Sequence, residues 1–337
     1  MPIGSGAKYA NIPNVTSLGV GLNYGNEWTS SVVITTSSDP MVNVLVNTNW
    51  YPNDNWNFLY KGGKTCNNTR SVEATIRNYV ANSWAMYSGN PWATISTPDS
   101  SQWVLPASYH ASISDFNATA HFKLGSCPSA DTDGLMAVFQ PNGWVLDTYA
   151  TVVMSNGDIV AEATASYIDA KGDGTGWWNG RRASMIPSFA GLIRTGEIAG
   201  GSIPHALAVT ISPTELMQQA TWPAYAFDHN SGYSGTLPMG ALLAIPPSVS
   251  IASLGLTATG KVVAKTLQSY GAYIVDRTAP GGLNFQAELG DPEIRWNGWQ
   301  NDLTIIGHHL KWVTNNSSTN LGGGGTPLAP LAPPFSN

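Results

Sequence analysis

The segment 143–168 constrains the fold of this chain more than any other stretch. Runs of alternating apolar and polar residues lie on both sides of Asn156 and Gly157, and Asn-Gly between such runs is the strongest short signal for a β-hairpin. A two-residue turn at this dipeptide places Glu162 opposite Thr151. Asp147 then shares the polar face with Glu162, at about 14 Å for a rise of roughly 3.4 Å per residue. The segment predicts two antiparallel strands whose carboxylates are too far apart to act as a catalytic pair with each other.

Other short β-branched runs, such as 32–36 and 42–47, are separated by Gly, Pro, Ser and Asn. Such runs are typical of strands joined by turns. One segment, 258–270, predicts a helix, because Thr257 is a suitable N-cap and Gly271 a suitable residue just beyond the end. We therefore expect a mainly β protein, a β-sandwich or jelly roll with one helix and long aromatic-rich loops.

The domain organisation follows from length and from the composition of the C-terminus. A chain of 337 residues is long enough for one large β domain or two smaller ones. We interpret 1–314 as a single β-rich domain. Residues 315–337 contain a Gly run followed by a Pro-rich run, which is the composition of a tail or linker. If ordered, such a tail has to dock on something, and assembly of copies through the tail is one possibility.

The charge of the chain excludes several classes of partner. Charged residues make up 11% of the chain, against about 25% in an ordinary soluble domain. Only 15 Lys and Arg are present and the net charge is −6, so a nucleic-acid partner is not expected. No apolar run is long enough for a membrane-spanning helix. Surfaces that are polar but uncharged are typical of secreted proteins that bind glycans, and we expect a secreted protein whose partner is a neutral polysaccharide.

Two cysteines, Cys66 and Cys127, bear on the compartment. In a secreted chain a single disulfide between them is the natural interpretation. The alternative is two reduced thiols in a cytosolic protein. Neither cysteine belongs to a CxxC motif, so they do not predict a zinc site, and we expect neither a metal nor a cofactor.

Several segments of the C-terminal half are distinctive: RASMIPSFAGLIRTGEIAGGSIPHAL (182–207), TWPAYAFD (221–228), LPMGALLAIPPSV (237–249), LGLTATGKVVAKTLQSYGAYIVD (254–276) and the block 296–313. On these segments the chain resembles a group of uncharacterised secreted bacterial proteins. Relatives in this group carry an Arg after the PMGA motif, where this chain has Leu242. The resemblance implies a secreted, β-rich protein and supplies no catalytic residue.

Two carboxylates are the candidate catalytic groups. Asp228 stands among aromatic residues, a setting that raises the pKa of a carboxyl group and suits a general acid. Asp276 ends the predicted strand that follows the helix. The structural alternatives are a turn-capping role for Asp228 and a surface pair between Asp276 and Arg277.

The segment 191–207 carries three further candidates, Arg194, Glu197 and His205. Arg194 and Glu197 are three residues apart and could pair across a helical turn. His205 lies in an apolar run, as a supporting catalytic residue or as a hydrogen-bonded core residue. We expect this segment to form the wall of a site.

Aromatic residues suggest the substrate. The chain has 13 Trp, and exposed rings stack on sugar faces as they do on nucleic-acid bases. The candidates for substrate binding are Arg194 together with the aromatic residues Trp177, Trp178, Trp222 and Tyr225.

These features favour a glycoside hydrolase that uses paired carboxylates. The alternative is a non-catalytic extracellular protein that binds glycans or assembles with copies of itself as a surface or filament subunit.

Overall fold

The computed structural model groups the chain into two compact units. Unit 1 comprises Met1–Gly25 and Lys171–Ser336, and unit 2 comprises Asn26–Ala170 with the last residue, Asn337. From the sequence we interpret 1–314 as one domain. In the structure these residues belong to both compact units. Each unit is described on its own. The residues that the structure describes are 1–24, 29–47, 119–124, 126, 134–149, 151–153, 157, 159–162, 166–170, 180–290, 294 and 299–333.

Both units are built mainly from strands, as expected. No helix in the described part of the chain is long and apolar enough to cross a membrane. Four residues with predicted roles, Cys66, Cys127, Trp177 and Trp178, lie outside the described residues.

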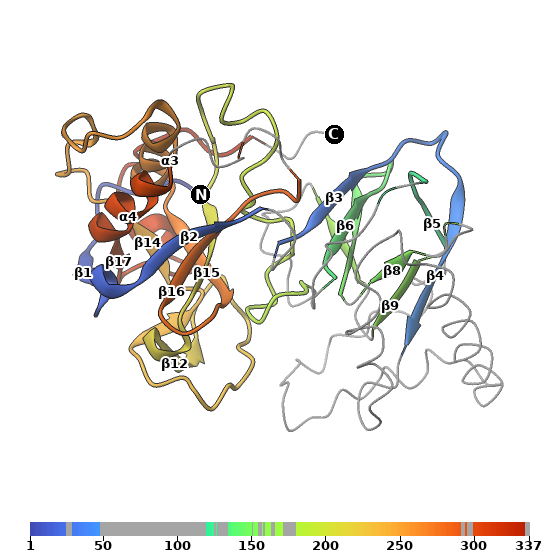
Figure 1. Cartoon of the computed structure of the whole chain (residues 1–337), viewed down its shortest axis with the longest axis horizontal. Helices are drawn as coiled ribbons and strands as arrows, with labels where there is room; N and C mark the ends of the chain where they lie inside the picture. The colour runs from blue at the N-terminus through green and yellow to red at the C-terminus, as the bar shows by residue number, and fades with distance from the viewer. Residues whose placement is uncertain are drawn as a thin grey trace. The chain divides into compact units, whose positions relative to one another are not determined.

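Unit 1 is organised around a seven-stranded mixed sheet (Figure 1). Strand β11 lies inside this sheet, parallel to β15 on one side and antiparallel to β16 on the other. The carboxyl ends of β11 and β15 therefore meet at one edge, where Ile211 is paired with Arg277. In spatial order the strands are β1 (Tyr9–Asn11), β17 (Lys311–Val313), β14 (Leu242–Ala244), β15 (Ala272–Arg277), β11 (Leu207–Ile211), β16 (Gly282–Gln286) and β2 (Gly19–Asn23).

Two α-helices contribute to the main core of unit 1, α3 (Ala258–Ser269) and α4 (Gln300–His309). Val263 of α3 and Ile306 of α4 join side chains of β11 in one buried cluster. The predicted helix is confirmed, and the Thr257 hydroxyl accepts a hydrogen bond from the Gly260 N–H at 3.2 Å. A short two-stranded sheet, β12 (Leu216–Ala220) with β13 (Leu237–Met239), completes the unit.

The expectation of a single helix is wrong, because α4 is helical as well. Its sequence, QNDLTIIGHH, holds β-branched residues and a glycine, which have weak helix propensity. Burial of Leu303 and Ile306 against the core overrides that preference. His308 and His309 end this helix and do not lie on a strand.

The C-terminal segment that resembles a linker packs against the N-terminus of the same chain. The Gly4 and Gly6 N–H groups donate to the carbonyls of Gly322 and Gly324, at 2.9 and 2.8 Å. A Cβ atom on Gly4 would lie 2.0 Å from the Gly324 oxygen, so the two backbones approach this closely only because residue 4 has no side chain. The N–H groups of Gly4 and Gly6 and the carbonyls of Gly322 and Gly324 are therefore hydrogen-bonded within the chain.

Unit 2 contains two four-stranded sheets that share one core. Val33, Met136 and Leu146 come from the first sheet, and Val42 and Ile159 from the second. The first sheet has the order β10 (Ser166–Asp169), β7 (Trp144–Thr148), β6 (Met136–Phe139), β3 (Ser31–Ile34); the second has the order β5 (Thr119–His121), β4 (Met41–Asn47), β9 (Ile159–Glu162), β8 (Val152–Val153).

The predicted hairpin register is wrong by one residue. Val152 is paired with Val160 and Val153 with Ile159 in the antiparallel pair β8–β9. Strand β7 belongs to the other sheet and pairs with β6 and β10. Asp147, which was expected on an open polar face, is fully buried in β7. The sequence pattern predicts that antiparallel strands flank this segment, and β8 pairs with β9 in this way, but the partner of each strand is chosen by the packing of both sheets.

The N-cap of α3 gives a test of helix docking. The Thr257 hydroxyl also donates to the buried carboxylate of Asp302 at the start of α4, so it links both helices. We expect Thr257→Ala to lower the free energy of unfolding by about 1–2 kcal/mol, measured by urea denaturation. Thr257→Ser keeps the hydroxyl and serves as the control; equal stability of the two variants would contradict the linking role.

Candidate functional site

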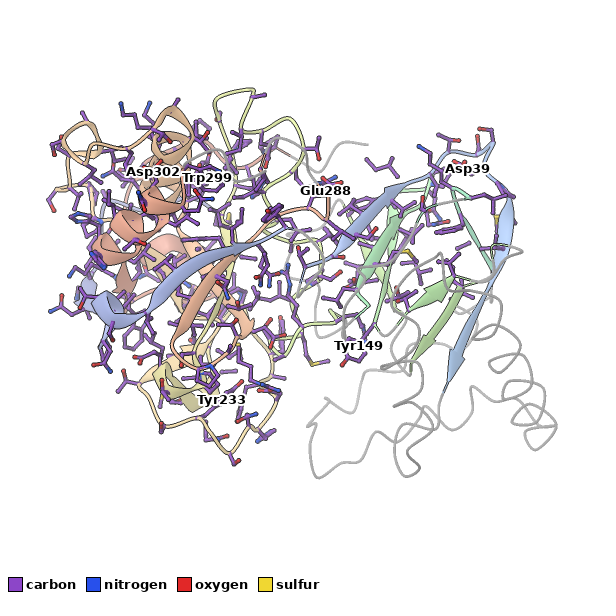
Figure 2. All side chains as sticks on the ribbon, in the orientation of Figure 1. Asp39, Tyr149, Tyr233, Glu288, Trp299 and Asp302 are labelled. Carbon is purple, nitrogen blue, oxygen red and sulfur yellow. The ribbon has the colours of Figure 1, made fainter. Side chains whose placement is uncertain are left out.

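The predicted carboxylates Asp228 and Asp276 lie together at the carboxyl edge of β11 and β15. Asp276 is the last residue but one of β15. Asp228 lies in the connection between β12 and β13. Tyr233, in the same connection, is marked in Figure 2. The end of β15 and this connection are far apart in sequence, and the fold brings their acidic side chains close enough for the charge of Asp228 to act on Asp276.

Each carboxylate oxygen of Asp228 accepts one hydrogen bond from a side chain. Arg277 Nε donates to Oδ2 at 2.8 Å, and the Tyr233 hydroxyl donates to Oδ1. The side chain of Asp228 is 28% exposed and that of Arg277 is 43% exposed, so the ion pair faces solvent on one side. Asp228 thus accepts from two side-chain donors, one of which is cationic.

Asp276 accepts two hydrogen bonds, both from backbone N–H groups. Ala183 donates to Oδ2 and Arg277 donates to Oδ1, each at 2.8 Å. Burial raises the pKa of Asp276 to about 6, opposed by these two hydrogen bonds and supported by the negative charge of Asp228. A carboxyl group with such a pKa takes up and releases a proton near neutral pH.

Tyr233 and Arg277 complete the site. Burial and the neighbouring Asp228 carboxylate raise the pKa of Tyr233 far above its ordinary value, so its hydroxyl stays a proton donor. The alternative to a site role for Asp276 was a surface pair with Arg277, but the Arg277 guanidinium pairs with Asp228. Sequence reasoning missed Tyr233. The clustering of Tyr, Asp and His between 225 and 233 was the only signal for it.

The backbone near the site adopts unusual conformations. Met185 and His229 have φ values of 62° and 48°, in the left-handed region that non-glycine residues rarely adopt. His229 follows Asp228 directly, and its ring packs on Phe227 with centroids 4.1 Å apart. Met185 belongs to the same loop as Ala183, which binds Asp276. Strained residues of this kind cluster at functional sites.

One of the two predicted aromatic residues near this site is open to solvent. Tyr225 is 41% exposed, and its N–H donates to the Ser184 carbonyl, next to the loop residue that binds Asp276. Trp222 packs edge-on against Tyr273 of β15, with ring centroids 6.2 Å apart. Tyr225 is therefore exposed, and its backbone is bound to the loop that also binds Asp276, whereas the Trp222 ring packs on Tyr273.

His205 and Arg194 lie near the other end of β11 and do not join the carboxylates. His205 Nε2 contacts Glu197 Oε1 and Nδ1 contacts the Ala206 carbonyl, both at 2.9 Å. Arg194 Nε pairs with Glu288 at 2.8 Å, so the predicted Arg194–Glu197 side-chain pair is wrong. A carboxylate and a carbonyl only accept hydrogen bonds, so both His205 contacts are made together when both ring nitrogens carry protons. Within the segment 191–207, His205 is thus bound to Glu197, and Arg194 ties the segment to Glu288.

Neither metal-ligand geometry nor comparison with known proteins assigns a function to this site. Among the described residues no group of three or more His, Cys, Asp or Glu side chains could hold a metal ion. No protein-family model, no curated protein and no solved structure matches the chain. The function therefore has to be argued from the chemistry of the Asp228–Asp276 pair.

The raised pKa of Asp276 predicts a stability change with pH. The pKa is about 6 in the folded state against an ordinary value of 3.8, so between these values the folded protein binds more protons than the unfolded chain. The contribution of this carboxyl to stability is fully present below pH 3.8 and is lost as the pH rises through about 6. We expect Asp276→Asn to flatten the dependence of the free energy of unfolding on pH in this window. Parallel wild-type and variant curves, from urea denaturation at a series of pH values, would refute it.

Proposed function

We propose that the chain is a secreted glycoside hydrolase that acts on a polysaccharide through Asp276 and Asp228. The observation that carries the proposal is the pairing of two unlike carboxyl groups. One is half-buried with a pKa near 6, and the other is bound by an Arg and a Tyr that favour its ionised form. Two carboxyls whose environments separate their proton affinities are the arrangement that acid-assisted glycoside hydrolysis requires.

In this proposal Asp276 is the general acid. Its proton goes to the glycosidic oxygen as the bond from that oxygen to the anomeric carbon breaks, and the bonding electrons leave with the oxygen. Asp228 supplies negative charge to the developing oxocarbenium ion, as nucleophile or as base for water. Tyr225, with its open ring, is the stacking surface for a sugar in this proposal.

A second candidate function, glycan binding without catalysis, is favoured by a feature of unit 2. We propose that the two sheets of unit 2 form a β-sandwich, because apolar side chains of both sheets contribute to one core. At the start of β7 the ring of Trp144 is 44% exposed. An exposed indole on a sandwich is a surface on which sugar rings stack, so unit 2 would hold the polysaccharide as a binding module.

A reducing-sugar screen over plant, fungal and bacterial glycans tests the hydrolase proposal. We expect Asp276→Asn and Asp228→Asn each to slow the release of reducing ends by about 10²- to 10⁴-fold. Glu288→Gln is the matched control, since it removes a carboxylate from an Arg pair of the same 2.8 Å length near the other end of β11. Full activity of Asp228→Asn, or no turnover of any glycan in the panel, would reject the hydrolase.

Affinity electrophoresis in gels that contain each glycan tests the binding role. We expect Trp144→Ala to abolish retardation, because the exposed indole provides the stacking surface. Asp276→Asn should be retarded like the wild-type protein. Equal retardation of Trp144→Ala and wild type would place glycan binding elsewhere.

A further inference from the structure

We infer that Tyr233 is the positioning residue that keeps Asp228 ionised and leaves the single proton of the carboxylate pair on Asp276. The catalytic meaning of this inference rests on the proposed hydrolase. The distribution of the proton between two side chains is a property of the folded protein alone, so it can be measured without any substrate.

The contacts of Asp228 leave little room for a proton. Tyr233 donates to Oδ1 and Arg277 to Oδ2, so a proton on either oxygen would replace or oppose a donor that is already present. An ionised carboxylate accepts both hydrogen bonds, whereas a protonated carboxyl has to lose or weaken one. The geometry therefore selects the ionised form of Asp228.

The contacts of Asp276 differ in kind. Its two donors are the uncharged backbone N–H groups of Ala183 and Arg277. Two neighbouring carboxylates cannot both ionise without cost, so one of the pair takes up the proton at the higher pH. Asp276 accepts from no cationic side chain, so it is the member that takes the proton.

Tyr233 discriminates between the two carboxyls better than Arg277 does. The charge of Arg277 also favours ionisation of Asp276, and its backbone N–H binds that carboxyl. The Tyr233 hydroxyl donates to Asp228. Removing Arg277 would therefore weaken the ionised forms of both carboxyls, whereas removing the Tyr233 hydroxyl acts on Asp228 directly and on Asp276 only through it.

The fold holds Tyr233 in place for this role. Its side chain is buried, with 6% exposure, and its N–H donates to the Asn230 carbonyl at 3.1 Å. Gln218 of β12 donates to the same carbonyl at 2.6 Å. The Asn230 side chain accepts the Gly232 N–H at 2.8 Å, which closes the turn before Tyr233. The hydroxyl is thus fixed at Asp228 before any ligand binds.

Carboxyl-carbon NMR of the whole chain, labelled with ¹³C at the aspartate side chains, tests the inference. The resonance that disappears in Asp276→Asn identifies Asp276, and in the wild type it should titrate near pH 6. In Tyr233→Phe the proton is shared with Asp228, the repulsion on Asp276 falls, and its midpoint should drop by roughly 0.5–1 pH unit. Tyr270→Phe removes a hydroxyl that donates to the Pro330 carbonyl at 3.0 Å and should leave the midpoint unchanged.

A second variant tests the same coupling without changing Tyr233. Asp228→Asn removes the negative charge that raises the pKa of Asp276, so it should lower the Asp276 midpoint at least as far as Tyr233→Phe does. An unchanged midpoint in folded Tyr233→Phe overturns the inference, and so does an unchanged midpoint in Asp228→Asn, which remains decisive if the Phe variant does not fold. A protein that shows these shifts but hydrolyses no glycan would refute the proposed function and leave the role of Tyr233 intact.

Discussion

Strand β11 is buried at every residue, and its two pairings determine where polar chemistry can occur in unit 1. Its parallel partner β15 ends at the same edge of the sheet, so backbone and side chains that follow both strands meet there. The sheet interior has no place for charge, because apolar side chains fill it. Charged groups that belong to these strands are consequently found at their ends, as in other sheets with parallel strand pairs.

The two aspartates at that edge differ because their donors differ. Asp228 accepts from a cation and a hydroxyl, whereas Asp276 accepts from backbone N–H groups. Desolvation raises the pKa of Asp276, and the nearby charge of Asp228 adds to that rise. The fold thereby places two residues of the same type in different environments.

The same edge shows how far local sequence could predict the site. Asp228 and Asp276 were chosen from their neighbours, one among aromatic residues and one at a strand end, and the structure places both at one edge. Their partners were less visible, because Tyr233 is an ordinary loop residue in the sequence and Arg277 was weighed only as a surface partner of Asp276. His205, Glu197 and Arg194 were grouped correctly by proximity. The predicted side-chain pair between Arg194 and Glu197 was wrong, because Arg194 forms its ion pair with Glu288, some 90 residues away.

The sequence by itself determined the local structure: mainly strands, the helix over 258–270 with its Thr257 cap, and an antiparallel strand pair on either side of Gly157. These depend on residues a few positions apart, whose propensities and hydrogen bonds act within one segment. Only the tertiary structure decided the helicity of α4, the register of β8 with β9, the docking of the glycine run and the partners of Asp228. Each of these depends on burial or close approach between distant segments, and no short stretch of sequence carries that information.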